Sequence, residues 1–388
     1  MKTCSRRKFL IHSGVALGAC LLPSSGLAGD LFKISGSVKG AIFKNDAPKA
    51  LWKWAVEAMY YHKTENNGVV CRTCPNACNL SPGDRSICRS KINIRGTLYS
   101  IAYGNPCSVN IDPVEKKPLF HYKPGSKIFS IATAGCNFRC LNCQNWEISQ
   151  ARPEDLRNYD LFPEKVAENA QKYSSQAIAY TYSEPSTYYE YMTDTAALAK
   201  QSGLGNLWIS NGYINREPLE KLCTLIDGAN VNLKSFSDAI YQKLNGGHLN
   251  PVLETFKTLH EKRVHFEMTN LVVPGYTDDE PMMRKMCKWI LSTLGPDYPL
   301  HFSRFFPKYR LKRLVPTPVG VLTRFRNIAL DIGLRYVYVG NVPNHEGNHT
   351  WCHSCSRLLI RRNGYRISEN NLDGSQCRFC KTTIPGVW

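Results

Sequence analysis

Strand-like and helix-like stretches alternate through the middle of the chain, over residues 125–341. Strand-like runs occupy residues 128–133, 177–182, 207–210, 231–233, 265–273 and 300–305. Apolar residues recur at helical spacing between them, in residues 163–173, 187–201, 218–226, 251–262 and 282–294. Six such strand–helix units predict an α/β fold, a partial (β/α)6 barrel of the TIM type. A full eight-unit barrel would need about 250 residues.

The chain of 388 residues contains sixteen cysteines, and most of them fall into three closely spaced sets. The sets are Cys71, Cys74, Cys78 and Cys88; Cys136, Cys140 and Cys143; and Cys352, Cys355, Cys377 and Cys380. Disulfide frameworks are typical of much shorter secreted chains. The spacing therefore favours metal or iron–sulfur binding, with small Cys-rich modules at both ends of the barrel.

The middle set lies on the loop directly after the first predicted strand, in the spacing C-x3-C-x2-C. Three thiolates can hold three irons of a [4Fe–4S] cluster and leave the fourth iron free of protein ligands. An open iron can chelate the amino and carboxylate groups of a small molecule. Active sites of barrels lie at the carboxyl ends of the strands, where this loop begins. The alternatives are a structural zinc knuckle, or a fourth cysteine from elsewhere that closes the site.

The two flanking sets can each complete a site with four thiolates. The first runs C-x2-C-x3-C-x9-C, and the second pairs two C-x2-C motifs across 21 residues, close to the spacing of zinc ribbons. Zinc is the first expectation for the second set. Auxiliary iron–sulfur clusters are the alternative for both, because cysteine ligands alone do not distinguish zinc from iron.

Five segments carry a resemblance to a known family. They are DPVEKKPLFH at 112–121, GCNFRCLNCQN at 135–145, YTYSEP at 180–185, HFSRFFP at 301–307 and GVW at 386–388. Together they resemble the radical S-adenosylmethionine (SAM) superfamily, and within it the AmmeMemoRadiSam-system enzymes, which are related to pyruvate formate-lyase activating enzymes. The resemblance implies reductive cleavage of SAM to methionine and a 5′-deoxyadenosyl radical, which abstracts hydrogen from a substrate.

The same resemblance suggests cofactor contacts and partners. Glu184 stands where relatives place a Gly-Gly-Glu motif that binds the SAM amino group, with Tyr182 and Ser183 in place of the glycines. Ser210, Asn211 and Lys234, at the ends of the next two predicted strands, offer groups for the ribose or the carboxylate. Expected partners are a reductant protein such as flavodoxin or ferredoxin, and a protein or small-molecule substrate. Glycyl-radical activation is one form of the reaction, and Memo-like proteins are candidate partners.

The first residues, Ser5-Arg6-Arg7-Lys8 and the apolar stretch after them, resemble a twin-arginine export signal over residues 1–28. Cleavage after Ala28, lipidation at Cys20 and an unused signal are the three alternatives. The expected location is the periplasm or cell envelope if the signal is used, and otherwise the cytoplasm. Residues 29–124 are predicted to contain a helix over 51–60 and a Cys-rich module. Residues 125–341 are predicted to form the core barrel, and residues 342–388 a zinc-ribbon-like module.

The formal net charge is +18, which admits a nucleic-acid partner without requiring one. One alternative function is therefore an RNA-modifying radical enzyme that binds RNA through a basic tail containing Arg361 and Arg362. Another is a redox-inert zinc or iron–sulfur protein that keeps the barrel as a scaffold. No apolar run is long enough for a multi-span membrane protein.

Overall fold

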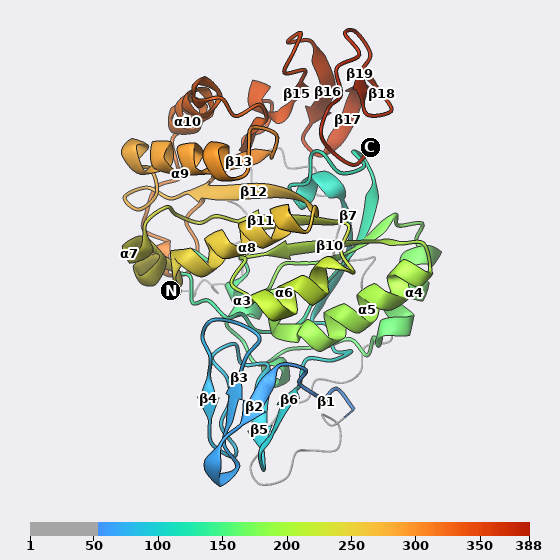
Figure 1. The fold of residues 1–388 in the computed structure, drawn as a ribbon, viewed down its shortest axis with the longest axis vertical. Helices are drawn as coiled ribbons and strands as arrows, with labels where there is room; N and C mark the ends of the chain where they lie inside the picture. Colours follow the sequence, from blue (N-terminus) through green and yellow to red (C-terminus); the bar gives the residue numbers. More distant parts are fainter. Residues whose placement is uncertain (1–52) are drawn as a thin grey trace, which may run out of the picture.

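The computed structural model describes residues 53–388, so the predicted export signal, with Cys20 and Ala28, lies outside the described residues. Its centre is an eight-stranded sheet in the order β14-β13-β12-β11-β10-β9-β8-β7 (Figure 1). The strands are β7 Ser108–Pro113, β8 Lys127–Ala132, β9 Ala177–Tyr180, β10 Gly205–Ser210, β11 Gly228–Asn232, β12 His265–Val272, β13 Leu300–Arg304 and β14 Val337–Gly340. Neighbours from β8 to β14 pair in parallel, and β7 pairs antiparallel with β8. The α/β fold is confirmed: all six predicted strands are present, and β7 and β14 extend the sheet.

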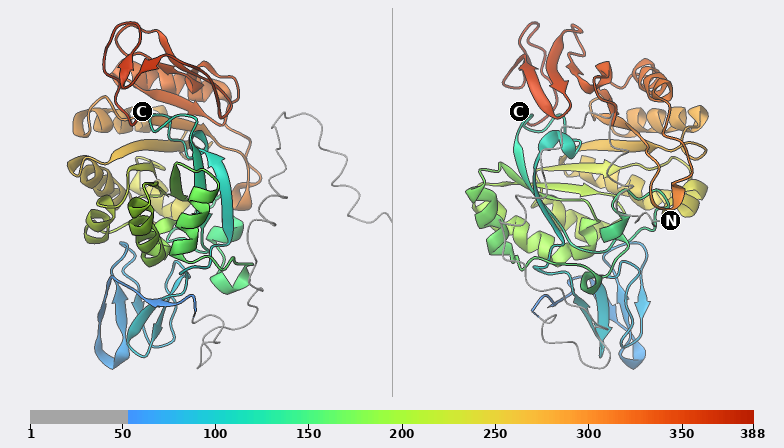
Figure 2. Two further views of the ribbon diagram at one scale, coloured as in Figure 1. Left: turned by 90° about the vertical axis from the view of Figure 1, so that its right-hand side faces the viewer. Right: turned by 180° about the vertical axis from the view of Figure 1, so that it is seen from behind.

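Helices follow the parallel strands and cover one face of the sheet (Figure 2). They are α4 Pro163–Lys172, α5 Tyr189–Gln201, α6 Arg216–Cys223, α8 Leu249–Glu261, α9 Glu280–Thr293 and α10 Val319–Ile332, with the short α3 Trp146–Ser149 and α7 Asp238–Ile240. Alternate strand residues such as Phe129 and Ile131 pack under the helices in the largest core cluster. Their neighbours Ile128 and Ala179 face the other way, against Leu119 and other residues of the segment before β8.

Two small sheets precede the central one, at the bottom of Figure 1. The first contains β1 Val56–Glu57, β6 Thr97–Ser100 and β5 Lys91–Ile94; the second contains β2 Tyr61–Lys63, β3 Val69–Cys71 and β4 Asn79–Leu80. The helix predicted over residues 51–60 was wrong, because its described part, from Lys53, is a turn followed by β1. Pairing of β1 with β6 and the Trp54 Nε1 hydrogen bond to Asp160 outweigh a helical pattern too short to stabilise itself.

The chain ends in a small β module, at the top of Figure 1. It contains β15 Thr350–Trp351, β16 Leu358–Asn363 and β17 Arg366–Asn370, and a second sheet of β18 Leu372–Asp373 and β19 Gln376–Cys377. The remaining turns are η1 Glu65–Asn67, η2 Val114–Lys116, η3 Pro153–Asp155, η4 Pro185–Tyr188, η6 Tyr309–Leu311, η7 Glu346–Asn348 and the π-helical η5 Tyr241–Asn245. Val387 N donates to His121 O at 2.7 Å, so the chain terminus returns to the segment before β8.

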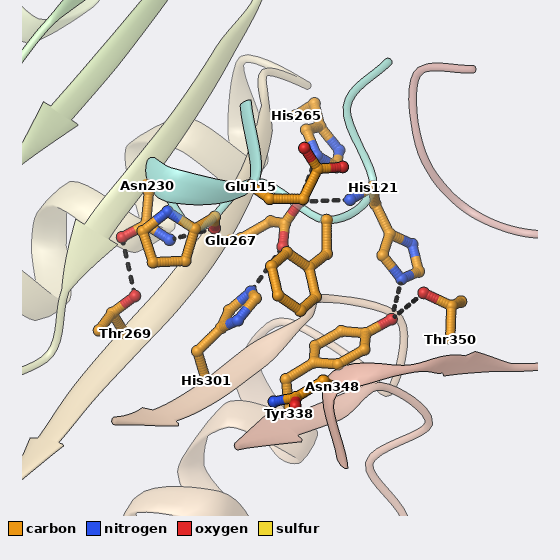
Figure 3. Close-up of polar contacts among 12 residues, drawn as sticks. Glu115, His121, Asn230, His265, Glu267, Thr269, His301, Tyr338, Asn348 and Thr350 are labelled. Carbon is orange, nitrogen blue, oxygen red and sulfur yellow. Dashed lines mark hydrogen bonds and ion pairs between the residues drawn. The ribbon is translucent and has the colours of Figure 1, made fainter. Parts of the chain in front are cut away.

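A buried polar network joins the terminus to the amino-terminal half of the sheet strands (Figure 3). Glu267 of β12 accepts hydrogen bonds from His301 Nε2 at 2.6 Å and from His121 N at 2.7 Å. His121 Nδ1 donates to Pro385 O, and its Nε2 accepts from the Tyr338 hydroxyl, both at 2.6 Å. The segments around His121, His301 and Trp388, which carry the resemblance, therefore meet away from the edge that carries the cysteine trio, and there they stabilise the fold.

This network predicts a loss of stability in mild acid. Burial lowers the pKa of His121 to about 4, with Arg362 and His265 adding to the shift against an opposing effect of Glu267. Between about pH 6.5 and pH 4, His121 binds a proton in the unfolded chain but stays neutral in the folded chain. The free energy of unfolding therefore falls as the pH falls through this window. We expect a loss of about 2 kcal/mol between pH 7.5 and pH 5 in urea unfolding followed by circular dichroism. Equal stability at the two pH values would contradict this role for neutral His121.

Candidate active site

The carboxyl ends of four neighbouring parallel strands bring the predicted site residues to one edge of the sheet. The cysteine trio follows β8, Glu184 follows β9, Asn211 follows β10 and Lys234 follows β11. Because β8 to β11 are adjacent and parallel, these segments form one continuous rim. Glu184 and Asn211 are buried, and Lys234 is half-buried.

Nitrogen donors surround the sulfurs of the trio. Phe138 N lies 3.4 Å from Cys136 Sγ, Asn211 Nδ2 lies 3.8 Å from the same sulfur, and Asn245 Nδ2 lies 3.2 Å from Cys140 Sγ. Hydrogen bonds to sulfur are part of the protein environment of iron–sulfur clusters. Three thiols on one loop, two of them supplied with N–H donors, are residues that fit a [4Fe–4S] cluster.

Burial raises the pKa of two of these thiols, Cys136 and Cys143. Burial raises the pKa of Cys136 well above its ordinary value, and the Glu184 carboxylate adds to this shift. Burial also raises the pKa of Cys143 to about 11, while the nearby Lys234 ammonium opposes part of that shift. Lys234 is therefore placed to offset negative charge at the trio, and its backbone N is held by a hydrogen bond to the Tyr241 hydroxyl at 3.0 Å.

The π-helical turn η5 supports the cysteine loop, and sequence analysis missed it. Arg139 N donates to Asn245 O at 2.8 Å, and Leu141 N donates to the carbonyl of Leu244 at 2.9 Å. A Cβ on Gly247 would lie 2.2 Å from the Phe138 ring, so the loop needs glycine there. The Asn-Gly-Gly sequence at 245–247 signals a turn, but only the fold places it against a loop about a hundred residues earlier.

Hydrogen bonds to Glu184 connect the end of β9 to the end of β10. Its Oε1 accepts from Ser186 N at 3.1 Å and from the hydroxyls of Ser186 and Ser210 at 2.7 Å each, while Oε2 accepts from Asn211 N at 2.8 Å. Burial raises the pKa of Glu184, and these hydrogen bonds act against that shift. Oε2 has one donor and can accept another. The structure thus joins Glu184, Ser210 and Asn211 into one polar unit beside Cys136.

Tyr182 and Ser183 stand where relatives carry two glycines, and Tyr182 keeps a backbone conformation that is typical of glycine. Tyr182 has φ of 63°, in the left-handed region that favours glycine. Its carbonyl accepts from Asn145 Nδ2 at 2.8 Å, and its hydroxyl donates to Asp112. Asp112 also binds Lys117 Nζ at 2.6 Å, and burial lowers the pKa of Lys117 to about 8. These contacts hold a conformation that costs a tyrosine energy, beside the cysteine loop.

The C-terminal set forms a compact four-thiol group. Among the described residues, it is the one group of three or more His, Cys, Asp or Glu side chains whose ligand atoms all lie within 4.8 Å of one another. Its sulfurs are 3.6 Å apart for Cys352 and Cys380, and 3.8 Å apart for Cys355 and Cys377. Four sulfurs at about 2.3 Å from a tetrahedral zinc are separated by about 3.8 Å. The geometry fits a single ion.

The RNA-binding role expected for Arg362 is wrong. Its side chain is buried, with Nη1 donating to Thr350 Oγ1 and Nη2 donating to Phe120 O, each at 2.8 Å. It therefore cannot reach a nucleic acid, because it closes the interior between the sheet and the C-terminal module. Arg361 is exposed and forms an ion pair with Glu369 at 3.0 Å.

Comparison with known proteins identifies the family. The Radical SAM superfamily model matches residues 130–287, which begin in β8 and include the trio and Glu184. An uncharacterized protein of Methanocaldococcus jannaschii is 44% identical over 330 residues, covering 84% of this chain and 98% of that protein. The chain belongs to the radical SAM superfamily. Membership implies a [4Fe–4S] cluster and SAM as cofactors.

Other superfamily members are more distant. The pyruvate formate-lyase 1-activating enzyme of Escherichia coli K12 is 27% identical over 158 residues, 39% of this chain and 63% of that enzyme. A solved radical SAM methyltransferase from Sphaerobacter thermophilus is 13% identical, with a TM-score of 0.44 over 61% of this chain and 71% of that one. In residues 53–388 of this radical SAM protein, the structure has no helix that is long and apolar enough to cross a membrane.

Proposed function

We propose that this protein is a radical SAM oxidoreductase that cleaves SAM reductively and uses the 5′-deoxyadenosyl radical to abstract hydrogen from a substrate. The observation that carries the proposal is the arrangement of three thiols, their amide donors and the Glu184 unit at one edge of the sheet. A closed structural metal site would have a fourth protein ligand, whereas the trio offers three cysteines and leaves a position for an exchangeable ligand.

Each predicted residue has a role in this proposal. Cys136, Cys140 and Cys143 hold the cluster, which supplies the electron for the cleavage. Glu184 Oε2, which already accepts from Asn211 N at 2.8 Å, accepts a further N–H from the SAM amino group. Ser210 and Asn211 keep this carboxylate in place, and the Lys234 ammonium offsets the SAM carboxylate.

SAM binding tests the proposal apart from catalysis. The protein is purified without oxygen, reconstituted with iron and sulfide, and reduced with dithionite in place of a flavodoxin or ferredoxin. We expect the electron paramagnetic resonance spectrum of the reduced cluster to change when SAM is added, because the amino and carboxylate groups bind the open iron. An unchanged spectrum, with no SAM retained in equilibrium dialysis, would instead support the redox-inert metal protein.

We propose an activating-type reaction, the formation of a glycyl radical on a partner protein, as the first reaction to test. Its support is the similarity to the pyruvate formate-lyase activating enzyme, which covers 39% of this chain. A glycyl radical signal that appears on a partner only with SAM and this protein would support it. Hydrogen transfer from a small molecule to the 5′-deoxyadenosyl radical would replace it with the other substrate class.

We propose zinc for the C-terminal set, because its sulfurs already lie at the separations of a zinc site. Replacing Cys377 by serine is expected to remove one zinc per chain and to lower Tm by roughly 10 °C, since a structural zinc stabilises the module that it closes. Metal content by mass spectrometry and thermal unfolding check this result. Cys223→Ser, outside all three sets, is the matched control. Unchanged zinc content in Cys377→Ser would contradict the assignment.

A further inference from the structure

The N-terminal cysteines enclose a cavity of their own. Cys71 ends β3, Cys74 and Cys78 lie on the next loop, and Cys88 lies on the turn before β5. All four line one small cavity of about 10 Å³, together with Lys91 and other residues. Such a volume has room for about one water molecule. The fold therefore gathers four thiols from a stretch of loops around a common centre.

This cavity distinguishes the N-terminal set from the C-terminal set. Four sulfurs held at about 2.3 Å from one ion touch one another and leave no room for water between them. The C-terminal sulfurs are in that arrangement, with separations of 3.6 and 3.8 Å. The N-terminal thiols stand back from their centre, since a water-sized space remains among them. Among the described residues, the C-terminal set meets the condition that its ligand atoms all lie within 4.8 Å of one another, and the N-terminal set does not. The N-terminal thiols are therefore spaced more widely than the ligands of a single tetrahedral ion, as the ligands of a cluster are.

The surroundings of the cavity suit a buried group with negative charge. Lys91 has 1% of its surface exposed, and its ammonium lies 2.6 Å from Glu190 Oε1. The hydroxyls of Ser86 and Ser90 lie 3.0 and 3.2 Å from Cys88 Sγ. Both hydroxyls also donate to backbone carbonyls, of Lys91 and Thr187. The buried ammonium, which Glu190 shares, offsets part of the charge that four thiolates leave on a metal centre.

The cavity also shares a wall with the radical SAM site. Asn137, which follows Cys136, lines it, and so do Ser186 and Thr187 from the turn after Glu184. Asn76 Nδ2, from the loop between Cys74 and Cys78, donates to Asn137 O at 2.8 Å. A Cβ on Gly135 would lie 2.3 Å from the Cys88 carbonyl, so the two cysteine loops are in contact.

We infer that Cys71, Cys74, Cys78 and Cys88 bind a second iron–sulfur cluster, separated from the cluster of the trio by a single layer of residues. This inference goes beyond the proposed function and does not depend on SAM cleavage. It assigns iron and sulfide to the N-terminal set and leaves a single zinc ion in the C-terminal set.

A variant without the trio isolates the N-terminal set. Cys136, Cys140 and Cys143 are all replaced by alanine, and the protein is reconstituted without oxygen with iron, sulfide and an equal supply of zinc. We expect iron and sulfide in equal amounts, with at least two irons and one zinc per chain, and an absorption band of an iron–sulfur cluster. Two zincs and no iron would overturn the inference.

The wild-type protein gives a second reading if the triple variant does not fold. A double variant, Cys74→Ser with Cys88→Ser, is expected to lose part of the iron and sulfide of the wild type and to keep its zinc, while Cys223→Ser loses neither. Mössbauer spectra of the wild type should then show more iron than one cluster accounts for. Iron for a single cluster in the wild type, unchanged in the double variant, would overturn the inference even if SAM cleavage is found.

Discussion

Replacing Cys140 by alanine is expected to lower the rate of SAM cleavage on the order of a thousandfold or more, to the level of the uncatalysed reaction. The side chain is one of three on the loop after β8, and Asn245 Nδ2 lies 3.2 Å from its sulfur. Without this ligand, two thiolates remain for three irons, and the cluster of the trio cannot be retained. The measurements are 5′-deoxyadenosine formed with SAM and dithionite, and iron per chain, which should fall by about four.

Cys136→Ala and Cys143→Ala are expected to have the same effect, because the three thiols act as one unit. The matched control is Cys223→Ala, a half-buried cysteine on α6 that contributes to none of the three sets. It should keep both activity and iron. Cleavage retained in Cys140→Ala, with iron unchanged, would show that the cluster is held elsewhere.

The second large effect concerns stability. Glu267→Ala is expected to lower the free energy of unfolding by about 2–6 kcal/mol, because each of the two buried donors that it leaves unpaired costs about 1–3 kcal/mol. Glu267 is fully buried and accepts from His301 Nε2 and His121 N, so the alanine variant leaves both donors without their partner and opens a cavity. Burial raises the pKa of Glu267, but the contacts with His265 at 3.5 Å and with His301 at 2.6 Å hold it below its ordinary value. Urea unfolding at pH 7.5 gives the measurement.

Two comparisons separate this effect from general sensitivity to mutation. Glu267→Gln keeps the shape and can still accept a hydrogen bond, so its loss should be smaller than that of the alanine variant. Glu168→Ala removes an exposed ion pair to Lys165 and should change stability by less than about 1 kcal/mol. Equal losses for Glu267→Ala and Glu168→Ala would contradict the account of the network.

Sequence patterns predicted the parts of the fold in which local pattern and burial agree. The strands around Phe129 and Met268 are buried along almost their whole length, as in a parallel sheet covered on both faces, and they were found within a few residues. Strand β7 was missed because its sequence, Ser-Val-Asn-Ile-Asp-Pro, mixes polar residues into an edge strand. Strand β14, Val337–Gly340, was also missed.

The residues of the candidate site also divide into those that the sequence predicted and those that it did not. The trio was visible because its three ligands lie on one loop, at a spacing that itself indicates the chemistry. Asn245 and Asn76 were not visible, since each reaches the cysteine loop from a distant part of the chain through the fold alone. His301 lies in one of the five segments that carry the resemblance, and its hydrogen bond to Glu267 at 2.6 Å places it in the core.

The most direct test of the central claim is the formation of 5′-deoxyadenosine by the wild-type protein. The protein is reconstituted without oxygen, its iron and sulfide are quantified, and it is incubated with SAM and dithionite. We predict 5′-deoxyadenosine and methionine in equal amounts, in excess over a control without dithionite. A fully loaded protein that binds SAM and forms neither product would contradict the claim that this site cleaves SAM.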